Sequence, residues 1–124
     1  MNESGLTSLY GIEGLDPQDG LSHFGDEEIY LRMLAKFTML HQGIRQDVLK
    51  AFENRDAEAA MAMLHKVRGA AGYVGATAVA ETALRIERDL RENGQFGEIL
   101  GMVDLLEDTL VRMNQAIRLA LGLS

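Results

Sequence analysis

Cysteine and tryptophan are absent from the sequence, and its 124 residues include a single proline. Without cysteine the chain has no disulfide framework, no thiolate nucleophile and no thiolate metal site. No stretch approaches the roughly 20 consecutive apolar residues of a membrane span, and the first residues lack the basic and apolar segments of a secretory signal. These absences predict a soluble, cytoplasmic domain with no membrane partner.

Positive charge is also in short supply, because 12 Lys and Arg residues face 19 Asp and Glu residues, which gives a formal net charge of −7. Nucleic-acid binding needs a basic face that neutralises phosphates, so this balance argues against a nucleic-acid partner. The residues present in quantity are Ala, Leu, Met, Glu and Arg, which favour helices. The composition therefore predicts an all-α protein, long enough to bury one core.

The order of the chain predicts five helices after an N-terminal leader. Residues 1–14 contain three glycines and little periodicity, so we expect them to be at most partly helical. Asp16-Pro17 supplies a capping side chain and a proline at the first helical position, which predicts a short helix over about residues 16–24, ending at Gly25. Apolar residues at helical spacing predict four longer helices, at about residues 26–53, 56–75, 77–94 and 96–121.

Local features mark several of these boundaries. Gly43 is expected to ease the long helix over residues 26–53 without ending it, Asp56 can cap the next helix, and Asn93-Gly94 is a favourable C-terminal pair. Long helices joined by short turns pack side by side. We therefore predict an antiparallel up-and-down four-helix bundle over residues 15–122, with the short additional helix across one end and residues 1–14 as a leader.

Two of the three histidines have an ordinary interpretation. His23 stands beside Phe24 at the end of the short helix, where partial packing against the bundle is expected. His41 is expected at a surface or boundary position of the long helix. No cluster of metal ligands converges on a recognisable site, so we predict no metal site, no bound cofactor and no independent hydrolase or metalloenzyme.

His65 differs from them because of its helical neighbours. The predicted core stripe of its helix leaves His65, Arg68, Gly69 and Gly72 together on another face, so we expect the imidazole to lie in solvent. Histidine is a nitrogen nucleophile near neutral pH. The cations Lys66 and Arg68 would neutralise an anion held at the ring. Nucleophile and charge together favour phosphoryl transfer.

Gly69 and Gly72 lie where a helix would favour alanine, each at a cost of roughly 1 kcal/mol. One explanation is the close approach of a second helix, which also selects glycine. The other is clearance, which lets the surface of another protein reach His65. The neighbouring charges of Lys66 and Arg68 favour the second explanation.

The pattern around His65 resembles the signature of histidine-containing phosphotransfer (HPt) domains of bacterial phosphorelays. The matching residues read His65-x-x-Arg68-Gly69-x-x-x-x-x-Gly75-Ala76. The resemblance extends over about residues 12–120, and it includes Ile12-x-Gly14-x-Asp16, Gly20-Leu21, Phe24-Gly25-Asp26-x-x-x-Tyr30-x-x-x-Leu34-x-x-Phe37 and Leu84-x-x-Glu87. The chain departs from the family where Arg68 replaces the usual lysine and Ala70 the frequent serine.

The resemblance implies a role for each matching residue. His65 would accept the phosphoryl group, Arg68 would assist as the basic residue, and Gly69 would clear the approach; Lys66 and Gly72 are supporting residues by local inference only. The implied partners are response-regulator receiver domains and a hybrid sensor histidine kinase. The receiver is expected to supply Mg²⁺, and without a nucleotide-binding loop the chain is not expected to phosphorylate itself from ATP.

Other functions remain open at this point. An HPt-like adaptor would bind a receiver or kinase without accepting phosphate, and a structural or oligomerising bundle would cover His65 in a dimer interface. The docking face is expected around His65 and exposed apolar residues of the long helix, and the protein is expected to be a monomer. Because the chain begins at Met1 and ends just past the last predicted helix, we expect a free-standing protein rather than a module of a hybrid kinase.

Overall fold

The computed structural model describes residues 5–92 and 96–123, and all of its regular elements in these ranges are α-helices. The prediction of an all-α protein is confirmed. None of the described helices combines the length and apolarity needed to cross a bilayer. In chain order the helices are α1 (Gly5–Leu9), α2 (Pro17–Phe24), α3 (Glu27–Leu40), α4 (Ile44–Glu53), α5 (Ala57–Val74), α6 (Thr77–Arg91) and α7 (Phe96–Ala120).

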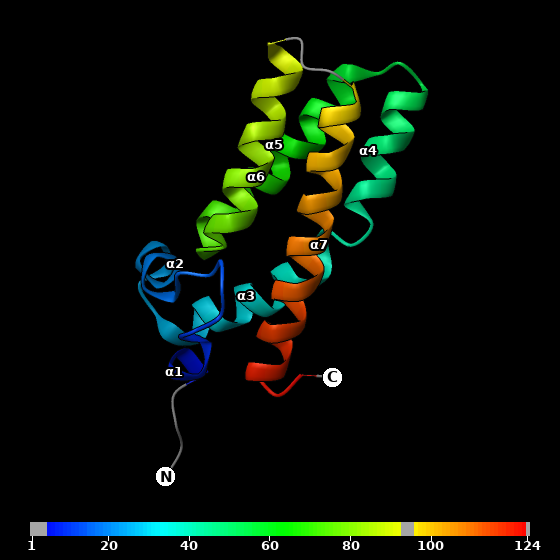
Figure 1. Ribbon diagram of the computed structural model, residues 1–124. Helices are drawn as coiled ribbons and strands as arrows, with labels where there is room; N and C mark the ends of the chain where they lie inside the picture. Colours follow the sequence, from blue (N-terminus) through cyan, green and yellow to red (C-terminus); the bar gives the residue numbers. More distant parts are fainter. Residues whose placement is uncertain (1–4, 93–95, 124) are drawn as a thin grey trace.

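Helices α4 to α7 form a bundle in which each helix runs opposite to the one before it (Figure 1). Helix α5 packs against α4 and α6, and α7 closes the bundle by packing against the same two helices. Residues 54–56 and 75–76 make the short turns that keep successive helices adjacent. The four helices therefore pack side by side in an antiparallel arrangement.

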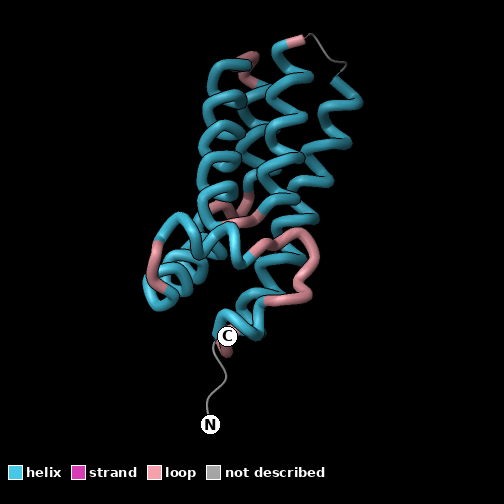
Figure 2. The backbone as a smooth tube through the Cα atoms, turned by 90° about the vertical axis from the view of Figure 1, so that its left-hand side faces the viewer, coloured by secondary structure: helices cyan, strands magenta, loops and turns pink. Residues whose placement is uncertain are grey.

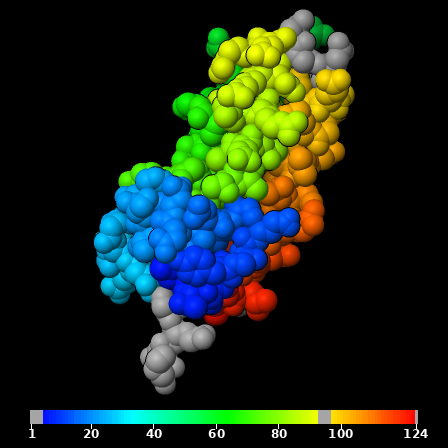
Figure 3. Space-filling model, turned by 60° about the vertical axis from the view of Figure 1, so that its left-hand side comes forward, coloured from blue at the N-terminus to red at the C-terminus, as the bar shows by residue number. Residues whose placement is uncertain are grey.

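The N-terminal helices form the other end of the molecule. Helix α7 is longer than its partners, and it continues past the bundle to contact α1 and α3 (Figures 1 and 2). Figure 3 shows the N-terminal residues, in blue, below α6 and against α7. Part of the predicted leader is helical as expected, and it also enters the core, because Leu9 on α1 is fully buried.

The prediction of one long helix over residues 26–53 is wrong, because the structure has two helices there, α3 and α4. Helix α3 ends at Leu40, and Gly43, whose φ of 78° is left-handed, is the residue directly before α4. The apolar pattern runs on across the break because both helices face one core, and both Phe37 and Ile44 are buried. As a consequence α4, and not one long helix, is the first member of the bundle.

Two of the predicted helix starts are confirmed in detail. The carboxylate of Asp16 accepts a hydrogen bond from the backbone N–H of Asp19 (3.1 Å), and that of Asp56 accepts one from Ala59 (3.0 Å). Helix α2 ends at Gly25 as predicted. Helix α6 ends at Arg91, and the Asn93-Gly94 pair expected to close it lies outside the described residues.

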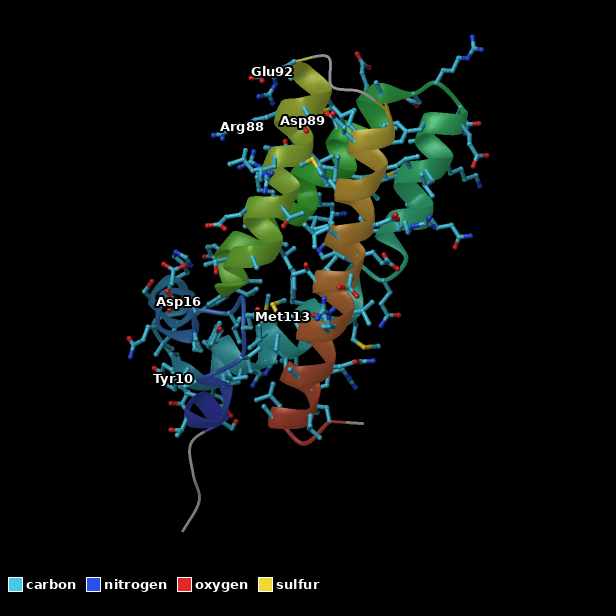
Figure 4. The ribbon with its side chains drawn as sticks, in the orientation of Figure 1. Tyr10, Asp16, Arg88, Asp89, Glu92 and Met113 are labelled. Atoms are coloured by element: carbon cyan, nitrogen blue, oxygen red, sulfur yellow. The ribbon has the colours of Figure 1, made fainter. Side chains whose placement is uncertain are left out.

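Tight packing joins α2 to the end of α5. A Cβ on Gly20 would collide with the carbonyl oxygen of Val74 and with the ring of Tyr30, whose hydroxyl donates a hydrogen bond to that same oxygen (2.8 Å). The N–H of Asp16 donates to the carbonyl oxygen of Gly75 (2.8 Å), and Figure 4 shows Asp16 near the lower end of α6. These contacts hold the C-terminal end of α5 in place, and α5 carries His65.

The core of the bundle is apolar and is supplied by all four of its helices. Burying a Val, Leu or Ile side chain contributes about 1.5–3 kcal/mol relative to leaving it exposed, so these residues dominate the stability of the fold. Its buried members include Ile44, Val48, Leu64, Val67, Val79, Ala83, Ile86, Val103, Leu106, Leu110 and Ile117.

Candidate functional site

His65 lies on the outer face of α5, and its side chain is 71% exposed. The residues on either side of it along the core stripe, Leu64 and Val67, are buried. The exposure expected from helical spacing is therefore confirmed. Because the backbone of α5 is held by packing on its other face, the imidazole has a fixed point of attachment and an open approach.

A buried carboxylate lies beneath the imidazole. Glu87 on α6 has a side chain only 2% exposed, and its Oε1 is 3.4 Å from Nδ1 of His65. Arg68, one turn along α5 and one-third exposed, contacts both groups: its Nε pairs with Oε2 of Glu87, and its Nη2 lies 2.9 Å from Nδ1 of His65. The structure thus brings Arg68 to the ring, as the sequence pattern indicates, and adds Glu87.

The carboxylate of Glu87 is tolerated in the interior because it is paired. An isolated buried charge is very costly, whereas one that is matched by an opposite charge and by hydrogen bonds recovers much of that cost. Arg68 supplies both, since a guanidinium presents several N–H donors in one plane. The pair also restricts the side chain of Arg68, which is long and flexible, to a position beside His65.

Sequence reasoning gave Glu87 no role of its own beyond its place in the Leu84-x-x-Glu87 pattern. One signal could have marked it. Glu87 stands four residues after Ala83 and eight after Val79, both of which are buried, so it falls on the core face of α6. A charged residue on an apolar stripe requires a partner, and only the packing of α5 on α6 shows that the partner is Arg68.

The two glycines beside His65 have open space around them. A Cβ added to Gly69 or Gly72 would meet no atom within 4 Å outside its own helix. Close approach of a second helix therefore does not explain these residues, and that explanation is wrong for both. Clearance over the helical turns that follow His65 is what they provide.

Lys66 does not join the cluster. It is exposed and makes no hydrogen bond or ion pair with His65 within the described chain. The pKa of His41 is lowered first by burial and then by the charge of Lys66. Of the two cations expected at the ring, the structure therefore places only Arg68 there.

The other two histidines have structural surroundings. The imidazole of His23 stacks on the ring of Tyr73, with 5.2 Å between centroids, and its Nδ1–H donates to the carbonyl oxygen of Tyr73 (2.8 Å). His41 is half-buried between α3 and α4, with its ring against Phe37. Among the described residues no group of three or more His, Asp or Glu side chains is placed to hold a metal ion.

Comparison with protein families identifies the class to which this arrangement belongs. The chain matches the model of the Hpt domain family over residues 32–119, which is more than half of its length, and it belongs to that family. The match spans most of α3 and nearly all of the bundle, and residues 12–31, which also resemble the family, lie outside it. No curated protein and no solved structure gave a significant match.

Membership places the protein among the histidine phosphotransfer modules of two-component phosphorelays. Hpt domains are phosphotransfer modules and not kinases, and they interact with the receiver domains of response regulators. The exposed imidazole with its bare helical surroundings is consistent with that class of activity.

Proposed function

We propose that His65 accepts a phosphoryl group from the aspartate of one receiver domain and passes it to the aspartate of another. The observation that supports this role is the asymmetry of the ring: Nδ1 faces Arg68 and Glu87, while the imidazole as a whole is 71% exposed. Nε2, on the opposite edge of the ring, is therefore the nitrogen that an incoming receiver can reach.

In the transfer, a lone pair of the ring attacks the phosphorus of the receiver's acyl phosphate. A nitrogen–phosphorus bond forms at His65, the phosphorus–oxygen bond to the aspartate breaks, and its electron pair leaves with the aspartate carboxylate. Catalysis of this kind rests on positioning and charge neutralisation rather than on covalent chemistry by further side chains. Arg68 supplies a positive charge beside the ring, and Glu87 positions both.

The receiver is proposed to supply the Mg²⁺ that neutralises the transferring group. This chain acts as a monomer in the cytoplasm, and a hybrid sensor histidine kinase is proposed as the source of the phosphoryl group. This chain would then supply the nucleophile and the docking surface.

The docking surface is proposed to run along α5 from His65 to Tyr73. Gly69 and Gly72 leave its middle open, and Tyr73, 53% exposed, ends it with an aromatic ring braced by His23 and Phe24. A bare path with an apolar anchor at one end and a charged cluster at the other suits a transient protein interface.

The test is to incubate the protein with a receiver carrying a labelled aspartyl phosphate. Acid-labile, base-stable label on the wild-type chain and none on His65→Gln is the expected result. Label that persists in His65→Gln would overturn the assignment of the site. Receiver binding that is unchanged in His65→Ala, with no label on the wild type, would establish a binding adaptor instead.

A further inference from the structure

The Nδ1 atom of His65 has two neighbours, one that requires it to accept a hydrogen bond and one that requires it to donate one. Arg68 Nη2, at 2.9 Å, can only donate a hydrogen bond. The carboxylate of Glu87, whose Oε1 lies at 3.4 Å and whose Oε2 pairs with the guanidinium, can only accept one. In a neutral imidazole one nitrogen carries the proton and the other does not. Nδ1 therefore satisfies Arg68 or Glu87, and not both.

The distances show which neighbour holds the ring in the free protein. A separation of 2.9 Å is an ordinary hydrogen bond, whereas 3.4 Å exceeds the usual range for N–H···O. Because Arg68 Nη2 can only donate, this contact requires Nδ1 to accept, and that requires the proton of the neutral ring to be on Nε2. In this tautomer the outward nitrogen has no lone pair with which to attack phosphorus.

We propose that Arg68 keeps His65 in this unreactive tautomer until a phosphoryl group draws the guanidinium away from Nδ1. Once Nδ1 is released, it takes up a proton and donates a hydrogen bond to Oε1 of Glu87, and Nε2, now without a proton, becomes the nucleophile. Arg68 and Glu87 are then positioning residues that select between two forms of the ring. The inference rests on the proposed phosphoacceptor role of His65 and specifies how that site is controlled.

The proton balance of the transfer follows from this exchange. The ring loses the Nε2 proton to water and gains one at Nδ1 from water, a path open to it because the side chain is 71% exposed. Attack by Nε2 then forms the nitrogen–phosphorus bond while the aspartate carboxylate departs with the electron pair. The phosphorylated ring keeps its Nδ1 proton, and Glu87 accepts the hydrogen bond from it, so no further base is required.

Arginine is suited to this double task because its guanidinium has separate nitrogens on one plane. Nε of Arg68 holds Glu87 while Nη2 holds His65. A lysine has one nitrogen at the end of its stem, and the buried carboxylate is its stronger partner. Lysine at this position would keep the ion pair with Glu87 and leave Nδ1 of His65 without its donor.

The experiment uses the full chain, labelled with ¹⁵N, in three forms: the wild type, Arg68→Lys and Arg88→Lys. The ¹⁵N shifts of the two ring nitrogens of His65, read while the ring is neutral, report which one carries the proton. Arg68→Lys retains the charge that pairs with Glu87, so it is expected to fold. Arg88→Lys makes the same exchange at an exposed residue of α6 (Figure 4) and serves as the control.

We expect the Nε2–H form to dominate in the wild type and in Arg88→Lys. In Arg68→Lys the tautomer equilibrium should move at least about tenfold toward Nδ1–H, the effect of losing one charge-assisted hydrogen bond. A wild-type ring already protonated at Nδ1, or an unchanged ratio in Arg68→Lys, would overturn the proposal. The tautomer measurement involves no phosphoryl transfer, so it tests this proposal separately. Absence of label at His65 in the receiver experiment would instead overturn the proposed function.

Discussion

His65 on α5 and His41 between α3 and α4 are two histidines in contrasting surroundings. His65 is largely exposed, and its Nδ1 is held by Arg68, with Glu87 close by. His41 is half-buried, and its Nε2 is buried without a hydrogen-bond partner in the described part of the chain. It lines a cavity of about 300 Å³ together with Asn114, whose Oδ1 is equally unpartnered there.

The contrast shows that surroundings, and not residue type, decide which histidine can do chemistry. A nucleophile needs one ring nitrogen in reach of a partner and the other one held, so that the ring keeps its orientation. A histidine that fills space at a helix break needs only a shape that fits. The α5–α6 site is accordingly expected to govern phosphotransfer, and the α3–α4 junction to govern stability.

The largest expected effect separates the two histidines directly. His65→Gln should lose all transfer from a phosphorylated receiver, because the nucleophilic nitrogen is gone, while its thermal unfolding stays close to that of the wild type. His41→Gln should transfer at a rate within about twofold of the wild type, since its ring packs against Phe37 at the α3–α4 junction. Transfer abolished in both variants would break the comparison.

Crowding the open path beside His65 should have the next largest effect. Gly69→Gln adds a side chain at a position where a Cβ would contact no neighbouring atom, so the helix is expected to be at least as stable. The added side chain should obstruct the approach of a receiver. Transfer should fall about tenfold or more in a stopped-time labelling assay, a loss of at least about 1.4 kcal/mol. Gly101→Gln, on an exposed part of α7 with equal space, is the matched control and should transfer normally.

At the helix break the effect should appear in stability alone. Gly43→Ala places a Cβ on a residue with φ of 78°, which costs roughly 1–2 kcal/mol. Gly101→Ala, inside α7, should instead stabilise the protein by up to about 1 kcal/mol. Urea unfolding measures both. A slower phosphotransfer in folded Gly43→Ala would show that the junction and the site are coupled.

The smallest expected effect is a pH dependence at His41. Its pKa is lowered in the folded protein, first by burial and then by the charge of Lys66, so the unfolded chain binds the proton more readily. The associated stability is complete above the ordinary histidine pKa of about 6.5 and is lost as the pH falls through the lower, folded value. His41→Gln should lose less thermal stability than the wild type between about pH 7 and pH 5. Equal losses would remove His41 as the cause.

Much of the fold could be predicted because its signals are local. Asp16-Pro17 and Asp56 mark helix starts through contacts within one turn, and Gly25 marks a helix end by its left-handed backbone. The break between α3 and α4 cannot be recognised from the sequence because the apolar pattern continues across it. In the structure α3 ends at Leu40 and α4 begins at Ile44, directly after the left-handed Gly43, and both helices pack on one core.

By itself, the sequence determined the helical content, most helix boundaries and the exposure of His65, all of which follow from short-range backbone preferences and helical periodicity. The tertiary structure alone decided that Glu87, 19 residues from Arg68 in the chain, lies beneath the imidazole. It also decided that Gly69 and Gly72 face open space, and that the charge of Lys66 helps to lower the pKa of His41. Such contacts depend on how α5 packs on its neighbours, and no pattern within one helix specifies that register.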